Sequence, residues 1–307
     1  MNLKMKMRVT ALVACLLLTA TLRAQTYKER FDAAFYSDSS VHLALPILRA
    51  WEAASPKDPD MLVAGFNFYF HASQEEVSQF SLTPPADGRE AFAITDSAGN
   101  QAGYMYSRIV FDPEVIKKGL SYIDRGIILF PKRLDMHFGK AYVLYEAGMY
   151  AEHVAYLEKI LELDSEFNGE WLWSDGEILE GDQEEFFTES FQDYLGTLAT
   201  SDVVEAEIAE GIILKAMDHY PKNTAFANDL GVLWFLEGDM EKAEDALLEA
   251  YDIDETDEVT LGNLGYLYLQ MSELSESKSY YEKLLTSEDS TTIEYAKAQI
   301  QFIGEQE

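Results

Sequence analysis

A framework of apolar and small residues occurs twice near the C-terminus of the chain. Leu230-Gly231 recurs as Leu264-Gly265, 34 residues later. The first copy places apolar or small residues three, four and seven positions apart, at Ala227, Leu230, Gly231 and Trp234. This spacing marks one face of a helix, so the framework predicts a helix whose apolar side packs on a neighbour.

A second helical face follows each first one, which predicts antiparallel helix pairs. Ala243, Leu247 and Ala250 form the face of the partner helix in the first copy. Small residues at 231 and 243 allow the two helices to approach closely, and Gly238 is suited to the left-handed conformation that ends the first helix. Each pair leaves an apolar face that the next pair covers, so the pairs are expected to stack.

These features resemble the tetratricopeptide repeat superfamily, whose period is 34 residues. The best copies are residues 224–257 and 258–291, and weaker ones extend the resemblance over most of residues 30–303. In one weaker copy, 133–166, Phe138-Gly139 takes the Leu-Gly place with two extra residues in its first helix. The resemblance implies an all-α fold, a right-handed superhelix of about five to six antiparallel helix pairs. The stretch 291–303 is expected to be a capping helix.

Two stretches interrupt the repeats. Alternating apolar residues around Gly99-Asn100 predict a β-hairpin at about 88–111, either a stiff cover for the helices or an edge that docks a partner. Residues 168–191 form an acidic loop with Trp171 and Trp173. These rings either pin the loop to the helices or form a platform for a sugar or peptide. The acids of this loop are expected to be solvated rather than gathered around calcium; they are Asp175, Glu177, Glu180 and Asp182.

The N-terminus has the three-part plan of a secretory signal peptide. Lys4, Lys6 and Arg8 precede an apolar run, and cleavage is expected after Ala24, so that residues 25–307 form the mature solenoid domain. Removal of four basic residues lowers the formal charge from −32 to −36, which disfavours nucleic acid as a partner. Cys15, the only cysteine, lies inside this leader, and we do not expect it to carry a lipid. We therefore expect an exported protein, in the periplasm or associated with the outer membrane, with no membrane span after cleavage.

Sequence signatures of catalysis were not found. The five histidines include no HExxH pair, and the chain has neither a GxSxG turn nor a glycine-rich phosphate loop. We therefore predict no enzyme activity, no cofactor and no metal site.

The resemblance also implies a binding surface. In tetratricopeptide repeats, first-helix residues that lie off the framework face line a concave groove. Carrying these places over selects Asn228, Val232, Phe235, Asn263, Tyr266 and Gln270, with Arg133, His137 and Lys140 from the weaker copy. The two best copies have no basic residue at these places, which argues against a clamp for C-terminal carboxylates. An uncharged or basic extended segment is expected there, and an acidic group near Arg133.

Three functions remain open from the sequence. The first is a non-catalytic scaffold of the bacterial cell envelope that binds a protein or peptide, as exported repeat proteins of Gram-negative bacteria suggest by resemblance. The second is a glycan-binding accessory of nutrient uptake that uses Trp171 and Trp173 as a secondary site. The third is a hydrolytic enzyme.

Overall fold

A computed structural model describes residues 26–37, 41–85, 88–179 and 181–306. The predicted signal peptide and Cys15 lie outside these residues. The chain divides into two compact units between Pro131 and Lys132. Among the described residues, no helix combines the length and the apolar character that crossing a membrane requires.

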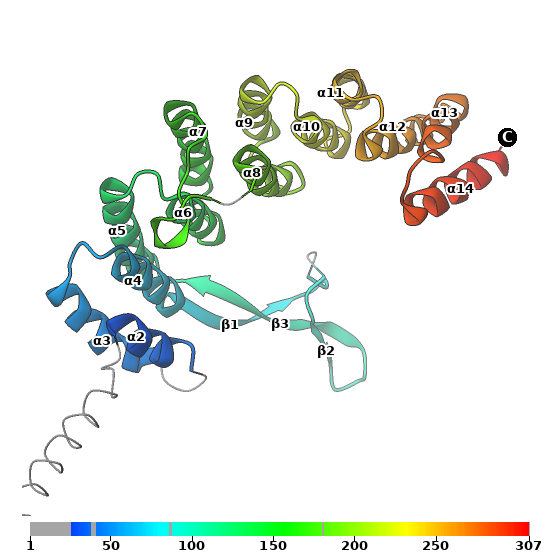
Figure 1. Ribbon diagram of the computed structural model, residues 1–307. Helices are drawn as coiled ribbons and strands as arrows, with labels where there is room; N and C mark the ends of the chain where they lie inside the picture. Colours follow the sequence, from blue (N-terminus) through cyan, green and yellow to red (C-terminus); the bar gives the residue numbers. More distant parts are fainter. Residues whose placement is uncertain (1–25, 38–40, 86–87, 180, 307) are drawn as a thin grey trace, which may run out of the picture. The chain divides into compact units, whose positions relative to one another are not determined.

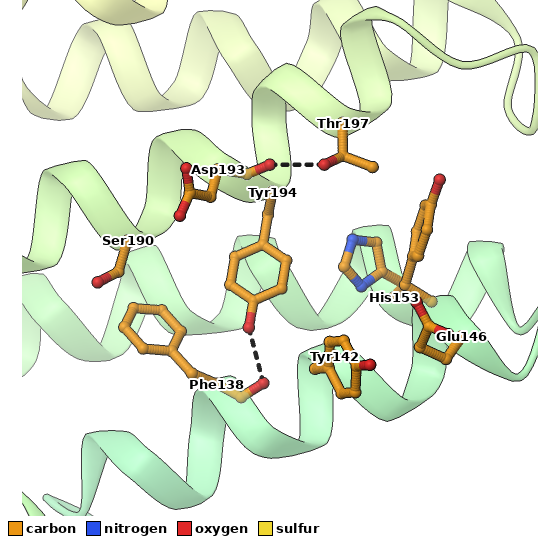
Figure 2. A pocket seen from close by; sticks show the side chains of 9 residues that line it. Phe138, Tyr142, Glu146, His153, Ser190, Asp193, Tyr194 and Thr197 are labelled. Carbon is orange, nitrogen blue, oxygen red and sulfur yellow. Dashed lines mark hydrogen bonds between the residues drawn. The ribbon is translucent and has the colours of Figure 1, made fainter.

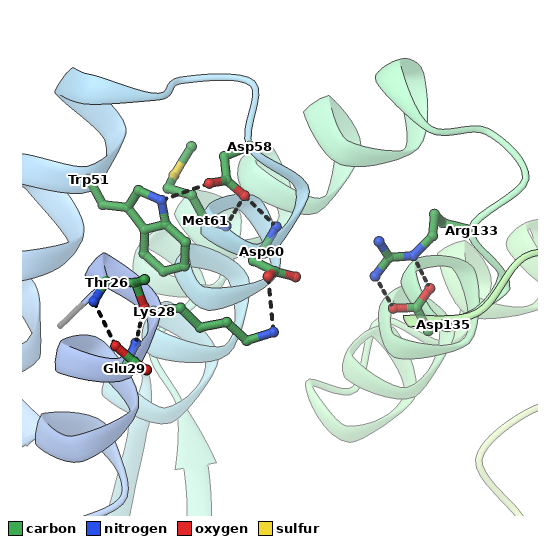
Figure 3. A network of polar contacts seen from close by, with 9 residues as sticks. All are labelled: Thr26, Lys28, Glu29, Trp51, Asp58, Asp60, Met61, Arg133 and Asp135. Carbon is green, nitrogen blue, oxygen red and sulfur yellow. Dashed lines mark hydrogen bonds and ion pairs between the residues drawn. The ribbon is translucent and has the colours of Figure 1, made fainter. Parts of the chain in front are cut away.

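The first unit contains four helices and a small sheet among its described residues (Figure 1). In chain order they are α2 (Tyr27–Phe35), α3 (Val41–Ala54), α4 (Pro59–Ala72), β1 (Gln74–Ser81), β2 (Phe92–Thr95), β3 (Gln101–Phe111) and α5 (Pro113–Leu129). Helix α2 packs on α3, and α4 packs on α5. Asp58 caps α4 through the N–H groups of residues 60 and 61 and also accepts a hydrogen bond from the indole of Trp51 (Figure 3). This bond ties the start of α4 to the buried Trp51 of α3.

The sheet is larger than the predicted hairpin. Strands β2 and β3 form the expected antiparallel hairpin, but β1 pairs with the other side of β3, so the strand order is β1-β3-β2. β1 is mostly polar, which gives little alternation of apolar residues for a sequence pattern to detect. Phe80 and Phe92 are both paired with Met105 across the sheet, and all three side chains are exposed.

The second unit continues the helix pairs (Figure 1). Its helices are α6 (Leu134–Glu146), α7 (Tyr150–Phe167), α8 (Gln183–Ala199), α9 (Ala206–His219), α10 (Thr224–Leu236), α11 (Met240–Ile253), α12 (Glu258–Gln270), α13 (Leu274–Leu284) and α14 (Ser290–Gly304), with a short turn η1 (Ser174–Gly176). Successive helices pair from α6/α7 to α12/α13, and α14 packs on α13. Together with α2/α3 and α4/α5, the described residues form six pairs and a final helix, which confirms the predicted repeat fold and cap.

The framework residues bring the helices of a pair together as expected. A Cβ placed on Gly231 would lie 2.5 Å from Cγ of Leu247, and one on Gly265 would lie 2.8 Å from the ring of Tyr281. Gly238 takes the left-handed conformation, with φ 80°, between α10 and α11. The small residues therefore set the spacing of the pairs α10/α11 and α12/α13.

Candidate functional site

The predicted groove residues of α10 and α12 lie beside one another; we call Asn228, Val232, Phe235, Asn263, Tyr266 and Gln270 the first-helix face. The two helices are linked through amide side chains. Asn228 is buried and donates hydrogen bonds to the Thr224 carbonyl and to Oγ1 of Thr260, at 3.0 and 2.8 Å. Its Oδ1 accepts a hydrogen bond from Nδ2 of Asn263 at 2.9 Å. Asn228 is thus an internal bridge. Asn263 is half-buried, and within the part of the chain that the structure describes its amide uses one hydrogen for this bond, which leaves Oδ1 and the second hydrogen for a ligand.

An aromatic pair continues this face beside the amides. The rings of Phe235 and Tyr266 lie 5.4 Å apart between centroids, and Tyr266 is 45% exposed. Val232 is half-buried and Gln270 is exposed. The first-helix face therefore offers amide groups next to accessible aromatic surface, a combination that suits the backbone and side chains of an extended peptide.

The structure corrects the alignment of the copy in α6 and α7. Gly148, with φ 71°, follows α6 as Gly238 follows α10. Counting back from these two glycines aligns Tyr142 with Val232 and Tyr145 with Phe235. By the same count, the places of the first-helix face in α6 are filled by Phe138, Tyr142, Tyr145 and Glu146. Phe138-Gly139 was a wrong starting point, and the left-handed glycine was the sequence signal that could have set the alignment.

This correction explains where the other predicted groove residues lie. Arg133 is 3% exposed and forms two hydrogen bonds with the Asp135 carboxylate, each 2.7 Å long (Figure 3). His137 is fully buried, with Nδ1 lying 2.8 Å from the hydroxyl of Tyr156, and the Lys140 ammonium lies over the Tyr156 ring. The structure thus joins His137 and Lys140 through Tyr156 of α7, away from the α6 places identified above. An acidic partner group at Arg133 would compete with Asp135, which already occupies the guanidinium.

A pocket lies where α6, α7 and α8 meet (Figure 2), with a volume of about 400 Å³. Tyr194 of α8 stands between Phe138 and His153, and its hydroxyl donates to the Phe138 carbonyl at 2.9 Å. His153 lies five residues after Gly148, where the better copy has Ala243 five residues after Gly238. An imidazole thus fills the place of a small framework residue and forms part of the pocket wall.

A buried carboxyl lies on α10, facing α8. Asp229 is 7% exposed, and its Oδ1 accepts a hydrogen bond from Gln192 at 3.1 Å. Its Oδ2 has no hydrogen-bond partner among the described residues. Burial, only partly offset by the Gln192 bond and reinforced by the charge of Asp193, raises the pKa of Asp229 to about 7.

The acidic loop, residues 168–191, is anchored to the core through its tryptophans. Trp171 is 1% exposed, and its indole donates to Asp164 at 2.6 Å; Trp173 is half-buried against the ring of Phe186. A ring buried as Trp171 is offers no face to a sugar, so the structure favours the anchoring role. In the loop, Asp182 caps α8, while Glu180 lies outside the described residues. The described residues contain no group of acidic or histidine side chains that could hold a metal ion.

Asp164 also begins a chain of polar groups. It accepts hydrogen bonds from the Tyr220 hydroxyl at 2.7 Å and from Nε2 of His219 at 2.8 Å, and Nδ1 of His219 lies 3.2 Å from the Ser165 hydroxyl. Serine hydrolases use the same order of carboxylate, imidazole and hydroxyl. Ser165, however, lies within α7, where backbone N–H groups are bonded inside the helix and cannot stabilise an oxyanion. The cluster's evident role is to hold Trp171.

Comparisons with known proteins agree with the helix pairs. Tetratricopeptide repeat models match residues 206–258 and 260–290, whereas no curated protein matches the sequence. Among solved structures, the chain is similar to a thermophilic TPR protein of Thermus thermophilus, with 17% identity, coverage of 60% of this chain and 90% of that one, and a TM-score of 0.36. It is also similar to PilW, a type IV pilus biogenesis factor, with 10% identity, coverage of 90% and 96%, and a TM-score of 0.38.

A third similar structure is a tetratricopeptide repeat protein of Parabacteroides merdae, with 10% identity, coverage of 95% of this chain and 89% of that one, and a TM-score of 0.33. Identities and TM-scores this low carry no information about function. The assignment of the repeats therefore rests on the two matching repeat models and on the helix pairs. Residues 206–258 and 260–290 are thus tetratricopeptide repeats, and the described helix pairs extend this fold over the rest of the second unit.

Proposed function

We propose that the protein is a binding scaffold whose first-helix face holds an extended segment of a protein or peptide. The observation that carries this proposal is the juxtaposition of Asn263 and Tyr266 with Asn228 and Phe235 across α10 and α12. Asn228 fixes the orientation of Asn263, so the amide is already placed before a ligand arrives. Preorganised groups lose less conformational entropy on binding, which favours recognition of a peptide backbone.

The segment is proposed to be uncharged or basic. The six residues of the first-helix face include no lysine or arginine, and the chain carries a formal charge of −32. An acidic segment would meet this field without a compensating cation on the face, whereas a basic one would be attracted to it. A face made of amides and aromatic rings supports the proposal of a binding role.

We also propose that the protein acts in the bacterial cell envelope after export. The support is the sequence of residues 1–24, with basic residues before an apolar run. Intact-mass measurement of the protein purified from its native host should give a chain that begins at Gln25. A chain that begins at Cys15 and carries a lipid would contradict cleavage after Ala24, and a chain that keeps residues 1–24 would contradict export. Neither outcome affects the binding face.

The binding proposal can be tested with peptides selected from a random library displayed on phage. A photoreactive benzoyl-phenylalanine introduced at Tyr266 should crosslink to the selected peptides. As a control, benzoyl-phenylalanine replaces Ser279, which is exposed on α13, and this variant should not crosslink. Crosslinking from Ser279 alone would place the binding surface elsewhere.

A further inference from the structure

The pocket between α6, α7 and α8 differs from the first-helix face in its chemistry. Phe138, Tyr142 and Tyr145 come from α6, and Tyr194 comes from α8, so four aromatic side chains line one cavity. Tyr142 is 49% exposed, which opens the cavity to solvent at that side. Aromatic faces carry negative potential and attract cations, most strongly where water is partly excluded.

Negative charge is present at the same cavity. Glu146 of α6 and Asp193 of α8 line it with exposed carboxylates, and no lysine or arginine lines it. Two carboxylates beside aromatic faces give the cavity a negative electrostatic potential, which attracts a cation and repels an anion.

His153 adds a hydrogen-bond acceptor. Its side chain is fully buried, and Nδ1 lies 2.9 Å from the carbonyl of Ala141. A carbonyl only accepts, so Nδ1 carries the hydrogen. Burial lowers the pKa of His153, partly offset by the Ala141 bond, which favours the neutral ring. Its Nε2 therefore has a lone pair, and this atom has no hydrogen-bond partner among the described residues. Because this atom is itself buried, a hydrogen-bond donor of a ligand would reach it only where a side chain of the pocket wall moves aside.

We propose that this pocket receives an arginine or lysine side chain of the segment bound along the first-helix face. The inference rests on the proposed function, because Phe138, Tyr142, Tyr145 and Glu146 fill in α6 the places that Asn228, Val232, Phe235 and Leu236 fill in α10. A long basic side chain presents both a cation for the rings and carboxylates and N–H donors for Nε2 of His153. Arginine fits best, because its planar guanidinium stacks on aromatic rings and carries five donors.

The proposal can be tested on the whole protein with capped amino acids. Acetyl-arginine methylamide and acetyl-lysine methylamide should perturb the ring resonances of ¹³C-labelled Tyr142 and Tyr194 in a saturable way. Capped citrulline, which keeps the shape of arginine without its charge, and capped norleucine should bind at least tenfold more weakly. Equal binding of arginine and citrulline would overturn the proposal.

Substitutions of exposed carboxylates can test whether capped arginine binds in this pocket, and they leave the buried residues unchanged. The pair Glu146→Gln with Asp193→Asn removes two exposed charges by isosteric changes, and we expect it to weaken binding of capped arginine at least tenfold. The matched control, Asp245→Asn with Glu276→Gln, removes the same charge from exposed places on α11 and α13 and should leave binding unchanged. If both pairs weaken binding equally, the loss comes from the lower net negative charge of the protein, and the proposal that this pocket binds arginine is wrong.

The two proposals fail separately. If peptides selected on the protein crosslink from position 266 but contain no enriched arginine or lysine, the scaffold function stands and the pocket inference is wrong. If capped arginine binds at Tyr142 and Tyr194 but no peptide crosslinks from position 266, the pocket exists and the proposed groove is wrong.

Discussion

One left-handed position shows how a single residue sets local stability. Gly238 and Ser272 occupy the same place, 34 residues apart, with φ of 80° and 64°. A left-handed conformation costs a residue with a side chain about 1 to 2 kcal/mol, and glycine avoids this cost. We therefore expect Ser272→Gly to raise the free energy of unfolding by roughly 1 kcal/mol. Chemical denaturation measures this change, and the reciprocal variant Gly238→Ser should lower the free energy of unfolding. A loss of stability in Ser272→Gly or a gain in Gly238→Ser would contradict the shared conformation.

A second prediction at this scale concerns Asp229. Its pKa of about 7 in the folded protein lies above the usual value of 3.8. The folded state therefore holds its proton more tightly than the unfolded state. The stability that this proton contributes is fully present below about pH 4 and is lost as the pH rises towards 7.

Asp229→Asn should remove this pH dependence. The stability of the variant relative to the natural protein should rise by roughly 2 to 3 kcal/mol between pH 5 and pH 8. Urea denaturation at the two pH values gives this difference. Asp245→Asn at an exposed place serves as the control, and a difference no larger than that of the control would show that Asp229 titrates normally.

The sequence pattern predicted the exposure of some proposed groove residues and not of others, and their role in binding stays a prediction. Tyr266 and Gln270 are exposed, as groove residues need to be, because a 34-residue period fixes their place on the helix. Asn228 occupies such a place yet is buried, because it bonds Thr260 on the next first helix. Such a bond joins residues 32 positions apart, and the repeat pattern alone does not reveal it.

At the scale of elements, a glycine in the first helix of a pair makes room for a large side chain of the second helix. Leucine at Gly231 would collide with Leu247, where a Cβ alone would lie 2.5 Å from Cγ. We expect Gly231→Leu to destabilise the protein by about 1 to 3 kcal/mol through overpacking. Gly262→Leu on α12 is the matched control, because a Cβ there meets no atom within 4 Å.

Hydrogen exchange measures where this loss occurs. Repeats contact mainly their neighbours, so amides of α10 to α13 should exchange faster in Gly231→Leu while those of α6 and α7 keep their protection. Uniformly faster exchange throughout the second unit would contradict repeat-wise stability.

The elements also show where sequence patterns fail. The helix pairs from α10 to α13 were predicted because their framework repeats with a fixed period. Strand β1 was missed because its polar sequence carries no alternation, and its partner β3 lies after a 19-residue gap from Ser81 to Gln101. The copy in α6 was misaligned because Phe138-Gly139 imitates the Leu-Gly pair, while the left-handed Gly148 marks the true end of the helix.

At the scale of the whole molecule, the proposed binding surface is made of positions that the repeat framework does not use. The framework residues are buried and hold the helices at fixed spacing, which leaves the remaining first-helix positions free to vary. In this chain those positions provide amides and aromatic rings on α10 and α12, and aromatic rings with acids on α6 and α8. The acidic character of the chain fits a partner segment that is uncharged or basic.

The most direct test of this account is the affinity of a phage-selected peptide for a variant of the first-helix face. In isothermal titration calorimetry, Asn263→Ala combined with Tyr266→Ala should raise Kd at least tenfold while the circular dichroism spectrum stays unchanged. Ser275→Ala with Ser279→Ala, two exposed places on α13, should leave Kd as it is. An unchanged Kd in the Asn263 and Tyr266 double variant would contradict the account and place peptide binding elsewhere on the molecule.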